Sequence, residues 1–344
     1  MRIAQIAPLF ESVPPKYYGG TERVVSYLTE ELVRKGHEVT LFASGDSVTS
    51  ARLIAPCERG LRLDKCCQDS MAHHVLMLEQ VFKVADQFDI AHFHIDYIHF
   101  PTLRRFRIPH VSTLHGRLDI PDWVALYREF CEMPVISISK SQQKPLSWVN
   151  WQGTIYHGLP KDLYSLREND GKYLAFLGRI SPEKRLDRAI RIARRAGIEL
   201  RIAAKVDPEN LDYFNDVVKP LLRDPLVEYI GEIGEAEKND FLGDACALLF
   251  PIDWPEPFGL VMIEAMACGT PVIAYSSGSV PEIIEDGVTG FLVNGFEEAV
   301  KAVSRIPTLS RRQCRKVFEE RFSSTRLAED YLKLFERLTA ARGK

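Results

Sequence analysis

The chain of 344 residues has no surplus of charge of either sign, since 44 Lys and Arg residues stand against 47 Asp and Glu residues and the formal net charge is −3. Proteins that bind nucleic acids usually carry a basic excess that neutralises phosphates. The local cluster of Arg191, Arg194 and Arg195 is typical of a solvated helix face. We therefore expect no nucleic-acid partner.

Paired cysteines and long apolar runs are also missing. The seven cysteines are an odd number, and no two of them form a Cys-x-x-Cys spacing, which excludes a zinc ribbon and a redox pair. No stretch approaches the ~20 apolar residues of a membrane span. The first apolar run, residues 3–7, is too short for a signal peptide. We expect a cytoplasmic protein without a strong membrane signal, and the oligomeric state stays open.

The sequence does contain a repeated strand–helix–strand pattern, in a chain long enough for two domains of roughly 150 residues. Residues 3–7 predict a strand, and a polar loop rich in proline and glycine follows. Apolar residues at helical spacing predict the next helix, which we expect Thr21 to cap and Gly36 to end. Residues 39–43 predict the second strand of a parallel pair.

The pattern restarts at residue 173, after a stretch (145–172) whose Pro and Gly residues indicate a linker. A strand over 173–177 leads to a helix that ends at Gly197, and a strand follows over 200–204. Further strands are predicted at 90–94, 111–114, 135–138, 227–230, 247–250 and 271–274. We predict an α/β fold with two doubly wound, Rossmann-like domains facing each other across a cleft, with ligands beyond the carboxyl ends of the strands.

The densest chemical signal lies in residues 253–272, which follow an apolar strand and carry the carboxylates Glu256 and Glu264. Two prolines and a glycine hold Glu256 before a helix, whose first free N–H groups are expected near Gly259–Val261. A carboxylate accepts two hydrogen bonds and therefore suits the vicinal hydroxyls of a sugar or ribose. An ordinary helix start with acidic residues that offset the helix dipole fits these residues equally well.

The spacing from Glu256 to Glu264 resembles the Glu-x7-Glu signature of the retaining family-four glycosyltransferases, which have the two-domain GT-B fold. Further segments match the family's motifs: Gly19-Gly20, His115-Gly116, Gly178-Arg179 with Lys184, Phe258–Leu260, Ala265–Val272 and Gly287–Val293. The resemblance covers about residues 1–335. It implies an acceptor-side domain over 1–160, a domain that binds the nucleotide sugar over 161–322, and a C-terminal helix over 323–344 that returns toward the first domain.

The resemblance also implies roles for single residues. Glu264 would bind the ribose hydroxyls of the donor, and Glu256 would bind the transferred hexose together with backbone amides of the helix start. Arg179 and Lys184 would meet the diphosphate. The remaining expected contacts are Gly19 and Gly20 at the diphosphate, His115 at the hexose, Ile233 beside the nucleobase, and Phe258, Gly259, Leu260 and Val261 at the helix start.

The implied reaction is transfer of a hexose, with retention, from a nucleotide sugar to a small soluble acceptor. We expect UDP-glucose as donor, then GDP-mannose, and no cofactor besides this co-substrate. No Asp-x-Asp occurs to bridge a metal, so a metal-independent enzyme is expected. The chain departs from common family patterns at 203–207, where many members have a glycine-rich strand end, and at His157-Gly158, where many have Asn-Gly. These departures leave the base contacts open.

Two alternatives come from other classes of protein. His92, His94 and Asp96 resemble the first ligand cluster of some metal-dependent hydrolases, and the two histidines point to one side of a strand. However, residue 97 is a tyrosine, and no later His or Cys cluster completes the ligand set, which favours a polar strand end. The second alternative is a non-catalytic binder of nucleotide sugars, and turnover of a nucleotide sugar separates it from an enzyme.

Overall fold

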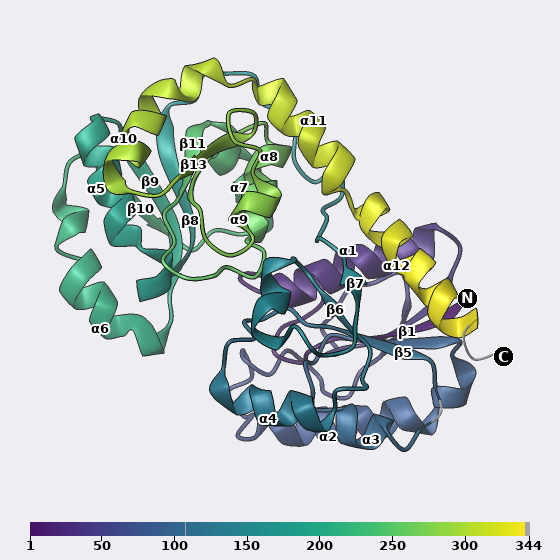
Figure 1. The fold of residues 1–344 in the computed structure, drawn as a ribbon. Coiled ribbons are helices and arrows are strands. Elements are labelled where there is room, and N and C mark those ends of the chain that lie inside the picture. Colours follow the sequence, from purple (N-terminus) through teal and green to yellow (C-terminus); the bar gives the residue numbers. More distant parts are fainter. Residues whose placement is uncertain (107, 341–344) are drawn as a thin grey trace. The chain divides into compact units, whose positions relative to one another are not determined.

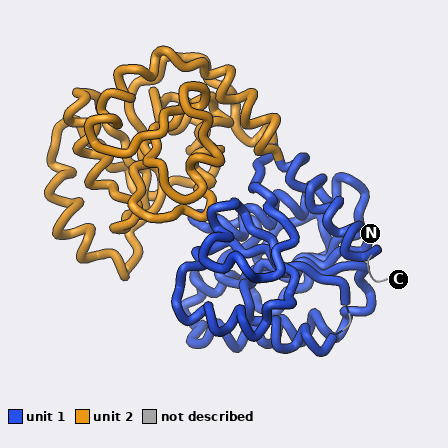
Figure 2. The backbone as a smooth tube through the Cα atoms, in the orientation of Figure 1, with its two compact units in different colours: residues 1–160, 324–344 blue, residues 161–323 orange. Residues whose placement is uncertain are grey.

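The structure, a computed structural model, describes residues 1–106 and 108–340, so the end of the predicted C-terminal segment (341–344) lies outside the described residues. The chain divides into two compact units (Figures 1 and 2). The first unit combines residues 1–160 with the segment from residue 324, and the second holds residues 161–323.

The first unit is built on a parallel sheet in which the described strands follow the order β3-β2-β1-β4-β5-β6-β7. Its strands are β1 (Arg2–Ile6), β2 (Glu38–Phe42), β3 (Arg52–Ile54), β4 (Ile90–Phe93), β5 (His110–Thr113), β6 (Val135–Ser137) and β7 (Trp151–Thr154). Helices α1 (Gly20–Arg34) and α12 (Ser324–Ala340) cover one face of the sheet. The other face carries α2 (Ser70–Lys83), α3 (Phe100–Leu103) and α4 (Pro121–Glu129), as Figure 1 shows. Short 3₁₀ turns lie at Ala85–Gln87 and Ser141–Leu146.

The second unit repeats this design with the strand order β10-β9-β8-β11-β12-β13. Its strands are β8 (Tyr173–Ile180), β9 (Leu200–Val206), β10 (Val227–Gly231), β11 (Ala245–Phe250), β12 (Val272–Tyr275) and β13 (Gly290–Val293). Its α-helices are α5 (Leu186–Ala196), α6 (Leu211–Tyr213), α7 (Glu235–Gly243), α8 (Leu260–Ala267), α9 (Val280–Ile283), α10 (Phe296–Arg305) and α11 (Arg311–Arg321). Four 3₁₀ turns (Pro182–Lys184, Pro208–Asn210, Leu221–Arg223 and Ile306–Thr308) and a π turn (Phe214–Val218) complete the unit.

Burial of apolar side chains between sheet and helices holds each unit together. In the second unit, Leu174, Ile202 and Leu249 of three neighbouring strands pack with Ile190 of α5 in one continuous core. Strands that are buried on both faces and joined by helices are what a parallel sheet requires. The predicted α/β class with two Rossmann-like domains is confirmed. No helix of the described chain combines the length and the apolar character that a membrane span needs.

Two local predictions are wrong. Residues 151–154 of the predicted linker form β7, an edge strand whose backbone pairs with β6. Helix α1 starts at Gly20, one residue before the predicted cap Thr21, and its N-cap Gly19 makes no side-chain cap bond. A Cβ at Gly19 would lie 2.7 Å from Cβ of Pro15, so the chain enters the helix through a contact that only glycine allows. Gly36 and Gly197 do end their helices with positive φ, as predicted.

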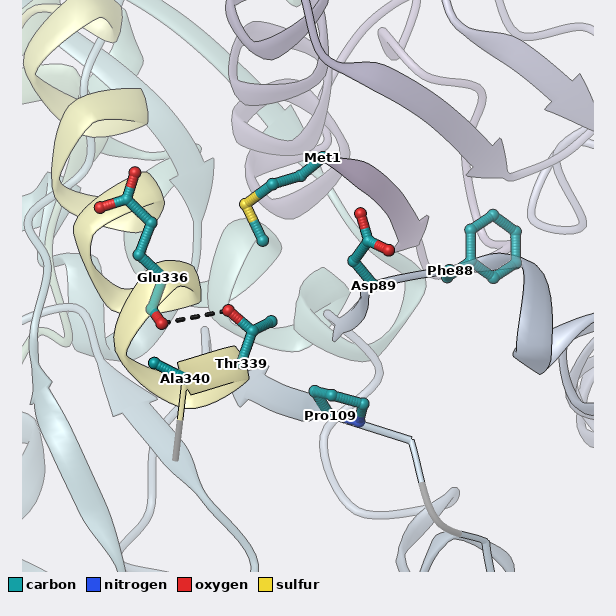
Figure 3. A pocket seen from close by; sticks show the side chains of 7 residues that line it. All are labelled: Met1, Phe88, Asp89, Pro109, Glu336, Thr339 and Ala340. Carbon is teal, nitrogen blue, oxygen red and sulfur yellow. Dashed lines mark hydrogen bonds between the residues drawn. The ribbon is translucent and has the colours of Figure 1, made fainter. Parts of the chain in front are cut away.

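Each sheet has one point where the strand order reverses, between β1 and β4 in the first unit and between β8 and β11 in the second. In doubly wound folds, ligands bind at the carboxyl ends of the strands beside such a point. A surface pocket of the first unit lies at the opposite, amino edge, beside Met1, Asp89 and Pro109 (Figure 3). The carboxyl edges of the two sheets are therefore the expected place for a ligand site.

Candidate active site

The carboxyl end of β8 carries Arg179, whose guanidinium lies among three carboxylates. Its NH1 and NH2 atoms are 3.6 Å from Asp207, 3.7 Å from Glu183 and 4.0 Å from Glu209. Its neighbour across the sheet, Lys205 of β9, pairs with Asp207 at 2.9 Å. The predicted phosphate-binding arginine thus stands at the expected edge of the sheet, in an acidic setting that the sequence did not reveal.

The structure brings two predicted residues, Lys184 and Glu256, into direct contact. Lys184 ends the 3₁₀ turn after β8, and its Nζ donates to Oε2 of Glu256. The indole Nε1 of Trp254 donates to the same oxygen at 2.8 Å. The ammonium group also lies over the rings of Phe250 and Trp254, at 5.5 and 5.1 Å from their centres. A buried carboxylate requires such compensation, and the lysine supplies it.

The loop that carries Glu256 is held by a neighbouring loop, which follows β12. The sequence reading missed this second loop. Ser277 donates to the carbonyl of Trp254 at 2.7 Å, and Ser279 donates through its backbone N–H to the carbonyl of Glu256 at 2.9 Å. Gly278 has φ +61°, and a Cβ there would lie 2.3 Å from the Glu256 nitrogen. The Ser-Ser-Gly-Ser run directly after a predicted strand was the signal that could have indicated this loop.

Helix α8 begins at Leu260 after Gly259, which adopts φ +81°. Glu264, on the second turn, is 3% exposed and receives a hydrogen bond of 2.8 Å from Nζ of Lys238 on α7. Lys238 is a further residue that the sequence reading missed, because nothing in the local pattern links it to Glu264. Phe258 is buried, and Leu260 and Val261 are half-buried. The described ion pair of Glu264 is with Lys238, whereas Lys184 pairs with Glu256. Ile233 is half-buried in the loop between β10 and α7.

In the first unit, His115 belongs to a cluster of histidines at the carboxyl edge of the sheet. Its Nε2 lies 2.8 Å from Nδ1 of His94, whose Nε2 lies 2.9 Å from Oε1 of Gln5. The ring of His115 stacks on His157 with centres 5.2 Å apart. His92 turns to Thr113, with its Nε2 2.7 Å from the hydroxyl. Gly19 and Gly20, the remaining predicted residues, form the start of α1.

Burial keeps these imidazoles neutral. It lowers the pKa of His115 to about 3 and holds the pKa values of His92, His94 and His157 well below the ordinary range for histidine. The pKa values of His92, His94 and His157 are lowered further by electrostatic repulsion from other histidines of the cluster in their protonated form. A neutral imidazole offers one donor and one acceptor, which suits hydrogen bonds to hydroxyl groups.

The alternative metal site is not supported by the geometry. Among residues 1–106 and 108–340, no group of three or more His, Cys, Asp or Glu side chains is arranged to hold a metal ion. The Nε2 atoms of His92 and His94 face Thr113 and Gln5, which are not metal ligands in this arrangement. Asp96 stands in a turn with φ +51°, and burial raises its pKa to about 6. The alternative metal triad His92/His94/Asp96 is therefore corrected: His92 and His94 form hydrogen bonds at a strand end.

Two family models match this chain. The one described as glycosyl transferases group 1 covers residues 164–320, and the one described as glycosyltransferase family 4 covers residues 18–152. An uncharacterized glycosyltransferase of Methanocaldococcus jannaschii is 27% identical, over 84% of this chain and 85% of that protein. A D-inositol 3-phosphate glycosyltransferase of Mycobacterium marinum is 35% identical, over 37% of this chain and 28% of that protein.

Solved structures share the fold over the whole length. The sucrose-phosphate synthase of Thermosynechococcus elongatus matches with a TM-score of 0.80 and 20% identity, over 99% of this chain and 100% of that one. Anabaena HepE, solved in complex with UDP-glucose, matches with a TM-score of 0.73 and 18% identity, over 99% and 100% of the two chains. These similarities show the GT-B architecture of two Rossmann-like domains.

Proposed function

We propose that this chain, which two glycosyltransferase family models match over residues 18–152 and 164–320, is a family-four glycosyltransferase that transfers a hexose from a nucleotide sugar to a small soluble acceptor with retention of configuration. UDP-glucose is the first proposed donor and GDP-mannose the second. The complex of the structural relative HepE with UDP-glucose supports the first choice. No cofactor and no divalent metal take part in the proposed reaction.

One observation carries the proposal: Glu256, just before α8, and Glu264, on its second turn, each have one carboxylate oxygen that makes no hydrogen bond to the described residues. The described residues engage Oε2 of Glu256, through Lys184 and Trp254, and Oε1 of Glu264, through Lys238. In each case a lysine offsets the cost of burying the charge, and the second oxygen stays available as an acceptor. Vicinal hydroxyl groups of a ribose or a hexose are matching donors.

We propose that Glu264 accepts from the ribose hydroxyls and Glu256 from hydroxyls of the transferred hexose. The backbone N–H groups of Phe258, Gly259, Leu260 and Val261 add donors at the start of α8, and Ile233 flanks the nucleobase. In the first unit, Gly19 and Gly20 lie at the start of α1, and their backbone N–H groups are proposed to meet the diphosphate.

The chemical step requires stabilisation of the diphosphate that leaves. Arg179 presents a forked donor to its oxygens, and Lys184 supplies a compact positive charge. In the proposed mechanism, the acceptor hydroxyl attacks on the face from which the diphosphate departs, and the departing phosphate takes the proton of the acceptor. The protein then acts by stabilising charge and by excluding water.

Donor hydrolysis by the purified full chain tests the proposal. UDP-glucose and GDP-mannose are incubated separately with the protein, and the release of UDP or GDP is measured alongside nucleotide affinity by calorimetry. Release of either nucleotide excludes the non-catalytic binder. If neither donor is hydrolysed and neither nucleotide binds, the proposed function is wrong.

Two variants divide the proposed roles. Glu264→Gln keeps the shape of the side chain but weakens its hydrogen bonds to ribose, so nucleotide affinity is expected to fall about tenfold. Glu297→Gln, an exposed change in the first turn of α10, is the matched control and leaves affinity unchanged. His115→Ala is expected to leave nucleotide affinity intact and to lower turnover, because the proposed partner of His115 is the hexose. Loss of nucleotide binding with an unchanged rate at saturation would contradict that division.

A further inference from the structure

Three side chains form a hydrogen-bonded line across neighbouring strands of the first unit. Gln5 lies on β1, His94 directly follows β4, and His115 follows β5; these three strands are adjacent in the sheet. Oε1 of Gln5 lies 2.9 Å from Nε2 of His94, and Nδ1 of His94 lies 2.8 Å from Nε2 of His115. The backbone N–H of His94 is itself anchored to the carbonyl of Ile6 at 2.9 Å. The line therefore crosses three adjacent strands at the carboxyl edge of the sheet.

The direction of donation along this line follows from its first member. The carboxamide oxygen of Gln5 can only accept, so Nε2 of His94 must donate. Since a neutral imidazole carries one proton, Nδ1 of His94 is then an acceptor, and Nε2 of His115 donates to it. Only one nitrogen of His115 is left, its Nδ1, and it must carry a lone pair.

We propose that Gln5 and His94 are positioning residues that hold His115 in its Nε2–H tautomer, so that Nδ1 of His115 accepts a hydrogen bond from a hydroxyl group of the transferred hexose. The inference rests on the proposed function, in which His115 contacts that sugar. Nδ1 of His115 is buried and has no hydrogen-bond partner among the described residues. A buried acceptor without a partner is costly, and a sugar hydroxyl that donates to it removes this cost on binding.

Stacking supports the same assignment. The ring of His115 lies nearly parallel to that of His157, at an interplanar angle of 17°, which restricts its rotation. One hydrogen bond and one stacking contact thus fix the orientation of the His115 ring. Its tautomer is then the one property that the hydrogen-bonded line has to set. Burial keeps His115 and His94 neutral. Gln5 can therefore fix the tautomer of His94, and His94 the tautomer of His115, without a net charge on any of the three side chains.

The tautomer is measured directly by long-range ¹H–¹⁵N correlation spectra of the ¹⁵N-labelled full chain. The His115→Ala variant identifies the signals of His115 by their loss. We expect a protonated Nε2 and an unprotonated Nδ1 in the unmodified protein. A protonated Nδ1 would overturn the proposal, whether or not the protein hydrolyses a nucleotide sugar.

Gln5→Leu removes the acceptor that starts the line while keeping a side chain of similar size. We expect the His115 signals to become a mixture of tautomers and kcat for donor hydrolysis to fall about tenfold, with nucleotide affinity unchanged. Gln5→Met makes the same test with an unbranched side chain, should the leucine variant fail to fold. Ser112→Ala is the matched control, since it removes the hydroxyl partner of another buried histidine, His99, at 2.7 Å and leaves the line intact.

Failure of the proposed function and failure of the positioning role give different experimental results. If the tautomer shifts in Gln5→Leu while the unmodified chain hydrolyses no nucleotide sugar, the hydrogen-bonded line is correct and the proposed function is wrong. If hydrolysis occurs but Gln5→Leu and Gln5→Met leave both the tautomer and kcat unchanged, the positioning role is wrong. A fall of kcat in Ser112→Ala equal to that in Gln5→Leu would assign the effect to general loosening of the unit and would also overturn the proposal.

Discussion

The Nζ atom of Lys238 lies 2.8 Å from Oε1 of Glu264, and the two side chains are only 13% and 5% exposed. The two residues stand on different helices, α7 and α8, so their ion pair links these helices beside the sheet. Breaking a buried pair by removing one partner is costly because the other charge stays buried without compensation. The lysine that the sequence reading missed is therefore expected to matter for folding and for the geometry of the proposed ribose site.

Lys238→Met should destabilise the second unit by about 3 kcal/mol, since Glu264 keeps its charge and loses its partner. Urea unfolding measures the change. The double variant Lys238→Met/Glu264→Gln should recover most of the stability but not the nucleotide affinity. Lys172→Met is the control: its pair with Asp244 spans 3.4 Å with a lysine that is 70% exposed, and the loss should be near zero. Equal losses in the two lysine variants would contradict this account.

Arg179→Ala should lower turnover more than stability. Its proposed target is the charge that grows on the diphosphate in the transition state, and loss of one such donor costs roughly 3 kcal/mol, or about a hundredfold in kcat. Arg201→Ala, which removes a surface arginine paired with Glu199 and Glu228, controls for the general loss of positive charge. Lys184→Ala is the less clean test, because Lys184 also neutralises the buried Glu256. Near-normal kcat in folded Arg179→Ala would remove Arg179 from the mechanism.

Gly278→Ala should displace the loop that carries Glu256. Its Cβ would lie 2.3 Å from the backbone nitrogen of Glu256, and its φ of +61° is unfavourable for a side chain. We expect a loss of about 3 kcal/mol in stability and a fall in kcat of at least tenfold. Gly287→Ala has a similar φ, +74°, but its Cβ would meet no atom within 4 Å. This control variant should lose only about 1 kcal/mol of stability and keep its kcat. Equal losses in Gly278→Ala and Gly287→Ala would refute the steric argument.

Acid should unfold the first unit before the second. All nine histidines lie in residues 1–160, and burial lowers the pKa of His115 to about 3, far below the ~6.5 of an unfolded chain. A lowered folded pKa means that the unfolded state binds the proton first. Stability is therefore full above about pH 6.5 and falls as the pH drops toward 3, by roughly 1.4 kcal/mol per pH unit for each such histidine.

Hydrogen exchange with mass spectrometry resolves the two units within one molecule. Between pH 7 and pH 5, protection should fall in peptides from residues 1–160, where the pKa values of His92, His94 and His157 are also lowered. Peptides from 161–323, which contain no histidine, serve as the internal control. Parallel loss of protection in both units would show that the histidines do not set the acid response.

Donor hydrolysis should continue in excess EDTA. The proposed charge stabilisation comes from Arg179, Lys184 and backbone N–H groups, and the sequence has no Asp-x-Asp to bridge a metal to the diphosphate. Nucleotide release is measured before and after treatment with the chelator, and after addition of Mg²⁺ or Mn²⁺. Complete loss in EDTA that Mn²⁺ restores would contradict a metal-independent mechanism.

Local sequence patterns are sufficient to predict the α/β class, most strand positions and the two carboxylates Glu256 and Glu264. These features depend on local periodicity, on glycines such as Gly36 and Gly197 with positive φ, and on a motif whose members lie within eight residues of each other. Each of these features depends only on residues that are close together in the sequence. The start of α1 and strand β7 were misjudged because Gly19 is placed by Pro15, and β7 by its pairing with β6.

The groups that neutralise and orient the proposed site residues become evident only in the folded chain. Lys184 and Glu256 are 72 positions apart, Lys238 and Glu264 are 26 apart, and Gln5 and His94 are 89 apart. A buried charge or donor without a partner is energetically unfavourable, so a partner can be expected for each of these groups. The sequence does not indicate which of its many lysines or amides is that partner. That choice follows from the order in which parallel strands pair, because strand order brings distant loops to one edge of a sheet.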